Sequence, residues 1–250
     1  MKCLVTTLKG VVNDESLRKI GEIQMSVNSV DNPDYSSGQR ITIKSLDNQI
    51  LKCLGNGTFV DSNGSPKSNE CALSADRQMV AICGNGNYKV SIPNKYKMTY
   101  LKCGSAISAN IEELSFCKNL GSLEITNENT FGNIAVLKEL DSLASISLAG
   151  TSVYGTLDNL PKNTESVYLT NSKVEGMISD AGKLTSLTHL ILVDTNIQGR
   201  IEDFAQSQFN NGRTSGSIYC NFIRSGITYN ESAINKALTI QFTSSGYSIL

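Results

Sequence analysis

Apolar residues in the second half of the chain recur at a nearly fixed spacing. A short pattern occurs in five copies, and the first apolar residues of these copies are separated by steps of 23, 23, 21 and 23 residues: Ile111, Ile134, Leu157, Ile178 and Ile201. A period in the low twenties indicates a stack of coils, none of which buries its own apolar face alone. The spacing therefore predicts a repeat structure and makes binding or assembly, rather than catalysis, the default function.

Each copy opens with an alternation of apolar and polar residues. The apolar positions are Leu120, Leu123 and Ile125, then Leu143, Ile146 and Leu148, then Val167 and Leu169, then Leu187, Leu190 and Leu192. Such alternation predicts a strand with its apolar side chains inward. A second inward residue and a glycine follow, as in Val153 with Gly155, whereas Phe131 with Gly132 is shifted by one position. The returning segment of each coil is either a short helix or an irregular turn.

The first 97 residues show shorter alternating or apolar runs that are separated by clusters of Gly, Asn and Ser. These runs are Cys3–Leu8, Ile20–Val27, Arg40–Lys44, Gln49–Leu54, Gly57–Val60, Glu70–Leu73, Gln78–Cys83 and Asn87–Ile92. Regularly spaced short strands with such turns predict a small β-sandwich. Between the first two runs, Asn13–Arg18 is expected to form either one helical turn or an extended arm.

After Phe204 the period ends. The polar, glycine-rich segment Gln206–Ser217 predicts a loop, and strands are expected at 218–222, 226–229 and 238–242. A stack of coils exposes an unpaired end that needs a cap. The sequence thus predicts a mainly β protein in three parts: a β-sandwich-like docking domain at 1–97, a solenoid of about five coils at 98–204 and a C-terminal β cap at 205–250.

Charge and composition narrow the class of partner. The net charge is −1, with 22 basic and 23 acidic residues, so nucleic acid is not an expected partner. No apolar run approaches the ~20 residues of a membrane span, and the first residues lack the pattern of a signal peptide; we expect no membrane insertion. The seven cysteines are scattered and form no Cys-x-x-Cys pair, which favours buried thiols in a reducing cytoplasm over a disulfide framework or a zinc site.

The sequence predicts neither catalytic residues, nor a cofactor, nor a metal site. His189 is the single histidine and is expected to point outward from a repeat strand, without the nucleophile and acid of a catalytic arrangement. Acidic pairs such as Glu112–Glu113 and Glu202–Asp203 recur at one place in each coil. That place is expected to be the solvated start of the returning segment, where acids suit a helix N-terminus, rather than a glycosidase or calcium site. We therefore expect a protein that is not an enzyme.

The solvent side of the repeat strands is the candidate interaction surface, called the repeat face below. Stacking of the coils is expected to align Glu124, Ser147, Tyr168 and Ile191 in one column of outward residues, with His189 and Val193 in two further columns. Polarity decreases toward the C-terminal coils, and an exposed apolar patch often marks a partner surface. The alternative is that the cap or the 206–217 segment folds over this face.

The segments Thr151–Leu157 and Thr195–Ile201, and Ser172–Ile178 with Ser first, share the order Thr-x-Val-x-Gly-x-Leu, with Ile in place of Val or Leu in some copies. This order resembles a variant of the leucine-rich repeat. The resemblance covers about residues 98–204 and implies a solenoid; it is weak evidence for any one function.

The flanking segments resemble a narrower group. Residues 4–23 are similar to the opening of virion proteins from phages that infect Bacteroides, including the crAss-like group, and residues 226–230 with 240–247 are similar to C-terminal caps of the same proteins. The resemblance implies a head- or tail-associated structural protein of the fibre or decoration type. Its partners would be other virion proteins and copies of itself, and assembly would occur in the host bacterial cytoplasm.

Two alternatives remain beside this expectation. One is a receptor-binding or adhesin module that recognises a host surface protein or glycan through the repeat face. The other concerns location only, and places the protein in the bacterial cytoplasm rather than the virion.

Overall fold

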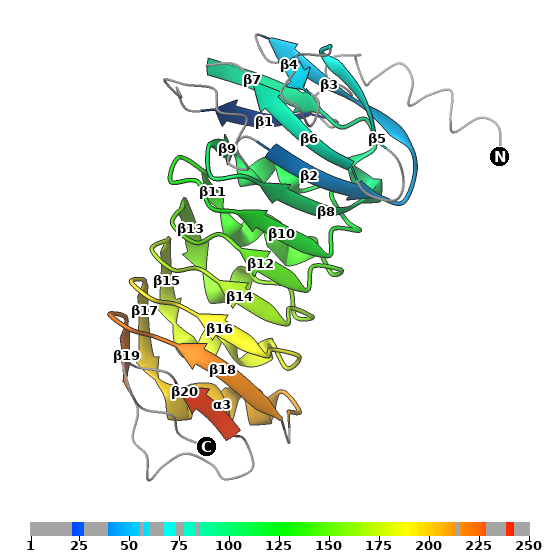
Figure 1. Ribbon diagram of the computed structural model, residues 1–250. Helices are drawn as coiled ribbons and strands as arrows, with labels where there is room; N and C mark the ends of the chain where they lie inside the picture. The colour runs from blue at the N-terminus through cyan, green and yellow to red at the C-terminus, as the bar shows by residue number, and fades with distance from the viewer. Residues whose placement is uncertain are drawn as a thin grey trace, which may run out of the picture.

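The computed structural model describes residues 22–27, 40–55, 58–60, 68–73, 78–83, 86–213, 216–228 and 239–242. Strands dominate these residues and helices are few and mostly short (Figure 1). The predicted mainly β class is confirmed. The expectations for Cys3–Leu8, for Asn13–Arg18 and for most of the similarity at 4–23 concern residues outside the described ranges.

The N-terminal strands lie close to where the sequence places them. They are β1 (Glu22–Val27), β2 (Arg40–Ser45), β3 (Gln49–Gly55), β4 (Thr58–Val60), β5 (Glu70–Leu73), β6 (Gln78–Cys83) and β7 (Gly86–Ser91). One sheet has the order β5-β3-β7-β1-β9 and includes β9 (Ile107–Ala109). The remaining strands β2, β6 and β4 belong to a second, larger sheet.

This larger sheet has ten strands in the order β20-β18-β16-β14-β12-β10-β8-β2-β6-β4. Its further members are β8 (Met98–Cys103), β10 (Ser122–Ile125), β12 (Ser145–Ser147), β14 (Ser166–Tyr168), β16 (His189–Ile191), β18 (Ser217–Asn221) and β20 (Thr239–Phe242). From β8 to β20 all pairs are parallel, whereas β2 pairs with β8 in the antiparallel sense. The sheet therefore runs without a break across the predicted boundary at residue 97, and the division into domains stays a prediction.

A second parallel sheet lies on another side of the stack. It comprises β11 (Phe131–Asn133), β13 (Ser152–Thr156), β15 (Lys173–Met177), β17 (Asn196–Arg200) and β19 (Gly226–Thr228), in that order. The returning segments are short 3₁₀ helices followed by one α-helix: η3 (Ile111–Leu114), η4 (Ile134–Glu139), η5 (Leu157–Asn159), η6 (Ile178–Lys183) and α3 (Ile201–Asn210). One more 3₁₀ turn, η2 (Lys95–Lys97), precedes β8.

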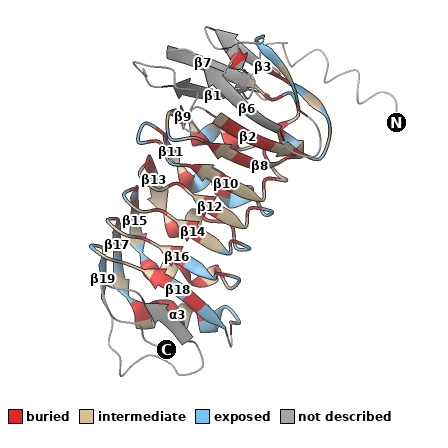
Figure 2. Cartoon of the chain, in the orientation of Figure 1, coloured by how far each residue is buried: buried red, intermediate tan, exposed pale blue. Residues whose placement is uncertain are grey.

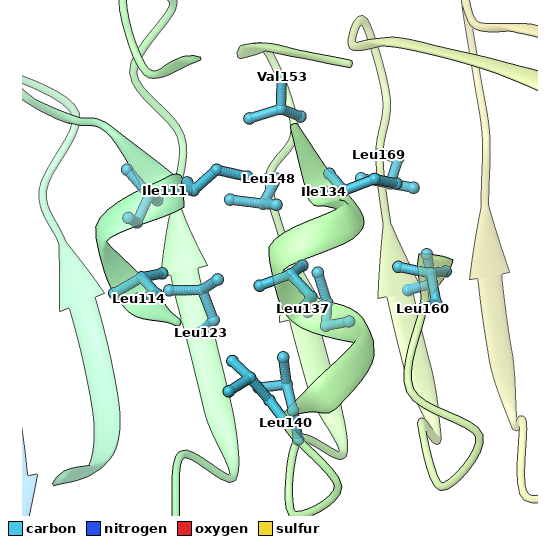
Figure 3. Close-up of a cluster of buried hydrophobic side chains, with 14 of the residues drawn as sticks. Ile111, Leu114, Leu123, Ile134, Leu137, Leu140, Leu148, Val153, Leu160 and Leu169 are labelled. Atoms are coloured by element: carbon cyan, nitrogen blue, oxygen red, sulfur yellow. The ribbon is translucent and has the colours of Figure 1, made fainter. Parts of the chain in front are cut away.

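The inward side chains of the strands and of the returning segments form one core. Figure 3 shows Ile111 and Leu114 of η3 and Ile134 and Leu137 of η4 pointing toward side chains of the strands such as Leu123. All of these side chains are fully buried or nearly so (Figure 2). Burial of one such side chain contributes about 1.5–3 kcal/mol. The core continues from Ile41 in β2 to Cys220 in β18, so the N-terminal strands and the coils share it.

The glycine of each coil is required by the second parallel sheet. The register pairs Gly155 with Val174 of the next coil, and Gly176 with Ile197 in the same way. Gly155 has a φ of 124°, a conformation that L residues rarely adopt. A Cβ atom there would lie 2.7 Å from the Asn133 Oδ1 atom. The recurring Val-x-Gly order thus reflects close contact between adjacent coils.

The expectation that Phe131 is an inward residue is wrong. Its side chain is 52% exposed, whereas Thr130 is fully buried. The register pairs Gly132 with Val153, so Thr130-x-Gly132 has the same spacing as Val153-x-Gly155. The Thr130 hydroxyl oxygen accepts a hydrogen bond from the Ala109 backbone nitrogen at 3.3 Å, which allows a polar residue in this buried position.

The predicted loop at 206–217 is wrong for its first part, because α3 continues to Asn210. Its buried residues are Ile201, Phe204, Ala205 and Gln208, a spacing that gives a helix one buried face. The Gln208 Nε2 atom donates to the backbone oxygens of Ala181 and Leu184, each at 3.0 Å. Because the fourth buried position is a glutamine, the spacing of apolar residues alone does not indicate this helix.

The strands expected within the C-terminal segment are present, and two of them repeat the plan of a coil. Strands β18 and β19 pair in parallel with β16 and β17, the strands of the preceding coil. The Ser225 hydroxyl donates to the Phe222 backbone oxygen at 2.7 Å, as the Thr195 hydroxyl does to that of Leu192 at 2.8 Å. Residues 217–228 thus continue both parallel sheets, and the role of 205–250 as a cap stays a prediction.

Candidate functional site

The parallel register aligns the residues of the repeat face across neighbouring strands. Glu124, Ser147, Tyr168 and Ile191 are successive partners in the ladder from β10 to β16. His189 lies in the adjacent column, two residues before Ile191, and Val193 follows the end of β16. The predicted alignment of the four ladder partners is therefore found; that the six residues form an interaction surface stays a prediction.

The N-terminal end of the repeat face is charged. The Lys102 Nζ atom lies 2.6 Å from the Glu124 Oε1 atom, and these two residues are partners in the ladder. The Lys44 Nζ atom lies 5.5 Å from the centroid of the Tyr100 ring. Glu124 thus has a partner within the chain. An ion pair exposed to this degree contributes ~0–1 kcal/mol, so it orients side chains more than it stabilises the sheet.

The C-terminal end of the repeat face holds a row of three rings. The His189 ring centroid lies 6.3 Å from that of Tyr168, with the planes inclined by 24°, and 5.9 Å from that of Tyr219, with an inclination of 48°. Both distances fall in the range of favourable aromatic contacts. The rings come from β14, β16 and β18, which are neighbours in the sheet (Figure 1). We call these three residues the aromatic row.

Sequence analysis missed Tyr219. The register pairs Tyr219 with His189, and its side chain is 37% exposed. The signal was present in Ile218-Tyr219-Cys220, where the alternation places Tyr219 between two buried residues. The end of the regular period after Phe204 places this strand in the predicted cap.

His189 is oriented by a short hydrogen-bonded chain. Its Nδ1 atom lies 3.0 Å from the Thr188 Oγ1 atom, and that hydroxyl donates to the Glu165 backbone oxygen at 2.9 Å. A hydroxyl can donate only one hydrogen bond, and the Thr188 hydroxyl donates it to this carbonyl oxygen. We therefore assign the donor role to His189 Nδ1–H. In the neutral ring Nε2 is then an acceptor, and it has no hydrogen-bond partner among the described residues.

The aliphatic members of the repeat face are less exposed than the sequence suggests. Ile191 and Val193 are half-buried, whereas His189 is exposed. Beside them, the Arg224 guanidinium donates from Nε and Nη2 to both carboxylate oxygens of Asp194. These hydrogen bonds lower the pKa of the Asp194 carboxyl and raise that of Arg224. This edge of the face is therefore bounded by a pair whose charges offset each other.

The described part of the 206–217 segment does not cover the aromatic row. Helix α3 packs against η6 instead, where the Gly182 position is so close to Ser207 that an added Cβ atom would overlap its Oγ atom. The Arg213 Nη1 atom donates to the Leu187 backbone oxygen at 2.6 Å, which holds the chain after α3 near the start of β16. His189 remains exposed.

Two acidic residues of the returning segments, Glu112 and Asp180, accept hydrogen bonds from the backbone. The Glu112 Oε1 atom accepts a hydrogen bond from the Asn133 backbone nitrogen of the next coil at 3.0 Å. The Asp180 Oδ2 atom accepts one from the Met177 backbone nitrogen at 3.3 Å, at the start of η6. Within the described ranges, no group of three or more His, Cys, Asp or Glu side chains is placed to hold a metal ion.

The cysteine side chains that the structure describes are free thiols. Cys103, Cys117 and Cys220 are buried, and Cys71 is half-buried. Burial raises the pKa of Cys103 to about 12 and, against the weaker influence of Lys95, that of Cys117 also to about 12. These three behave as the small buried residues that the sequence predicts. Of the helices in the described ranges, none has the length and apolar character to span a membrane.

No protein-family model matches the chain, and no curated protein matches it.

Proposed function

We propose that this chain is a leucine-rich-repeat protein that serves as a non-enzymatic structural component of a phage virion. In this proposal residues 1–97 dock on the particle, residues 98–204 form the solenoid and residues 205–250 cap it. The partners are other virion proteins and copies of the same chain, assembled in the cytoplasm of the host bacterium. The two parallel ladders and the repeat spacing support the solenoid, and the flanking segments support the virion.

The single observation behind the structural role is the continuity between the N-terminal strands and the coils. Strand β2 pairs with β8, and β1 pairs with β9, so that both N-terminal groups of strands are joined to the first coil. The Lys95 Nζ atom also donates to the Glu113 backbone oxygen at 2.8 Å, in a buried position. A contact made by the N-terminal strands thus fixes the orientation of the coils, as a rigid structural component requires.

Mass spectrometry of purified particles tests this proposal. We expect peptides of this chain to copurify with the particle through a density gradient at a fixed ratio to the major capsid protein. Mild salt washing should not remove them, because the docking contact is part of the assembled structure. Absence of the chain from intact, infectious particles would overturn the proposal.

A second candidate, recognition of a host surface protein or glycan, is favoured by the aromatic row. An exposed His ring between two partly exposed Tyr rings on one rigid face is the kind of surface that binding partners contact. Changing both Tyr168 and Ile191 to Asp should abolish attachment of particles to host cells and leave particle assembly intact. Gln198→Asp, on the exposed side of β17 in the other sheet, is the matched control. Normal attachment by the double variant would exclude this candidate.

A further inference from the structure

The dimensions of the aromatic row fit a small ligand. Three neighbouring parallel strands supply one ring each, and because successive ring centroids lie 6.3 and 5.9 Å apart the row is about 12 Å long. A stable protein interface buries ~800 Å² on each partner. A fully buried aromatic side chain contributes ~150–250 Å², and the three rings are only partly exposed. The row by itself is therefore too small for a protein interface and has about the length of a disaccharide.

The charge around the aromatic row favours a neutral ligand. The ladder partners of Tyr168 are Ser147 and Ile191, and His189 is flanked by Ser166. The Ser147, Ile191 and Ser166 side chains carry no charge. The ion pair nearest in the sequence, Asp194 with Arg224, is satisfied within the chain. Phosphate, sulfate and carboxylate groups find no unpaired cation in this set of residues.

The hydrogen-bonding groups of the row match a ligand that has hydroxyl groups. His189 Nε2 presents a lone pair, because Nδ1–H is used on Thr188, and the phenol of Tyr168 both donates and accepts. A saccharide ring has hydroxyl groups at its edge and apolar C–H groups on its faces. The hydroxyl groups suit His189 Nε2 and the phenol, and the C–H groups suit the ring surfaces. Binding sites commonly combine an apolar aromatic surface with a few placed polar groups in this way.

We propose that Tyr168, His189 and Tyr219 form a binding site for a neutral saccharide about two sugar rings long. This inference rests on the second candidate function, because it names the chemistry of the receptor that the repeat face would recognise. It adds Tyr219 to the site and assigns His189 the role of a hydrogen-bond acceptor.

Calorimetric titration of the full chain tests this site. The probes are neutral hexasaccharides of glucose, mannose and N-acetylglucosamine, with sialyllactose as an acidic comparison. We expect at least one neutral probe to bind and sialyllactose not to bind. His189→Ala and Tyr219→Ala should each weaken binding by ~10-fold or more, which corresponds to about 1.4 kcal/mol. His189→Gln, which keeps an acceptor, should retain more affinity than His189→Ala.

Tyr154→Ala is the matched control, because Tyr154 is 48% exposed on β13 of the other sheet. It should bind as the unmodified chain does, and circular dichroism should show an unchanged strand signal for every variant. Binding of none of the neutral probes, or equal binding by His189→Ala and the unmodified chain, overturns the saccharide site. If the Tyr168 and Ile191 double variant still loses attachment in that case, receptor recognition stands and its ligand is not a neutral saccharide. If attachment is also normal, both proposals fail.

Discussion

The coils that return through 3₁₀ helices and the coil that returns through α3 share the same two ladders. Strand β14 pairs with β16, and β16 pairs with β18, through the same three positions of β16. The pairing is the same although η6, which precedes β16, has six residues and α3, which precedes β18, has ten. The two strands of a coil, with their inward residues and glycine, therefore fix its position in the stack. The returning segment varies in length and type as long as it buries apolar residues at the same place, as Ile178 does in η6 and Ile201 in α3.

The largest loss of stability is expected from a substitution of the glycine in a regular coil. Gly155→Ala places a Cβ atom 2.7 Å from Asn133 Oδ1 and 2.9 Å from Ile134 Cγ1, at a φ of 124°. Backbone strain and overpacking together should lower the free energy of unfolding by about 2–4 kcal/mol. Urea denaturation followed by circular dichroism measures this change.

The control for Gly155→Ala is Gly212→Ala, at a glycine that follows α3. Gly212 also has a positive φ, of 93°, but an added Cβ atom would meet nothing within 4 Å. Only the backbone strain at positive φ remains, so the free energy of unfolding should fall by about 1 kcal/mol. Equal losses for the two variants would show that contact between adjacent coils does not explain the recurring spacing of Val and Gly in this chain.

The next effect concerns the attachment of α3 to η6. Gly182→Ala brings the new methyl group against the Oγ and Cβ atoms of Ser207 and should lower the free energy of unfolding by about 1–3 kcal/mol. Gly121→Ala is the control, since its nearest neighbour would be 3.5 Å away. Combination of Gly182→Ala with Ser207→Gly should recover part of the loss in a double-mutant cycle. Additive losses would contradict the packing of α3 on η6.

A smaller effect is expected at Gln208, the polar residue in the buried face of α3. Gln208→Leu keeps the apolar contact but removes the side-chain donor to the Ala181 and Leu184 backbone oxygens, each of which keeps one backbone N–H donor. The free energy of unfolding should fall by about 1–2 kcal/mol. Hydrogen exchange measured by mass spectrometry should show faster amide exchange in α3 than in η4 of the variant. A variant as stable as the unmodified chain would mean that these hydrogen bonds are not needed.

These residues also show how far the sequence predicts the fold. The strands and glycines follow from apolar alternation, because each inward position there is apolar. The prediction fails at Thr130 and Gln208, where hydrogen bonds to the backbone permit a polar side chain in a buried position. It also misses Tyr219 as a repeat-face residue, because α3 lengthens the coil beyond the period that identifies the others.

The smallest change in stability is expected from a substitution that makes one coil match its neighbours. The Ser172 Oγ atom is buried and has no hydrogen-bond partner among the described residues, whereas Thr151 and Thr195 at the equivalent positions donate to Leu148 and Leu192. Ser172→Thr restricts the hydroxyl to that geometry toward the Leu169 backbone oxygen. We expect a gain of about 0.5–1 kcal/mol in the same denaturation assay. A loss of stability would contradict the equivalence of these positions.

The proposed function implies an orientation in which the N-terminal strands face the particle and the aromatic row faces outward. Electron cryo-microscopy of purified particles tests this claim most directly. We predict symmetry-related copies of the chain, with the strands β2, β4 and β6 near another virion protein and with Tyr168, His189 and Tyr219 exposed to solvent. Absence of the chain from the particle, or a neighbouring subunit lying over the aromatic row, would contradict it.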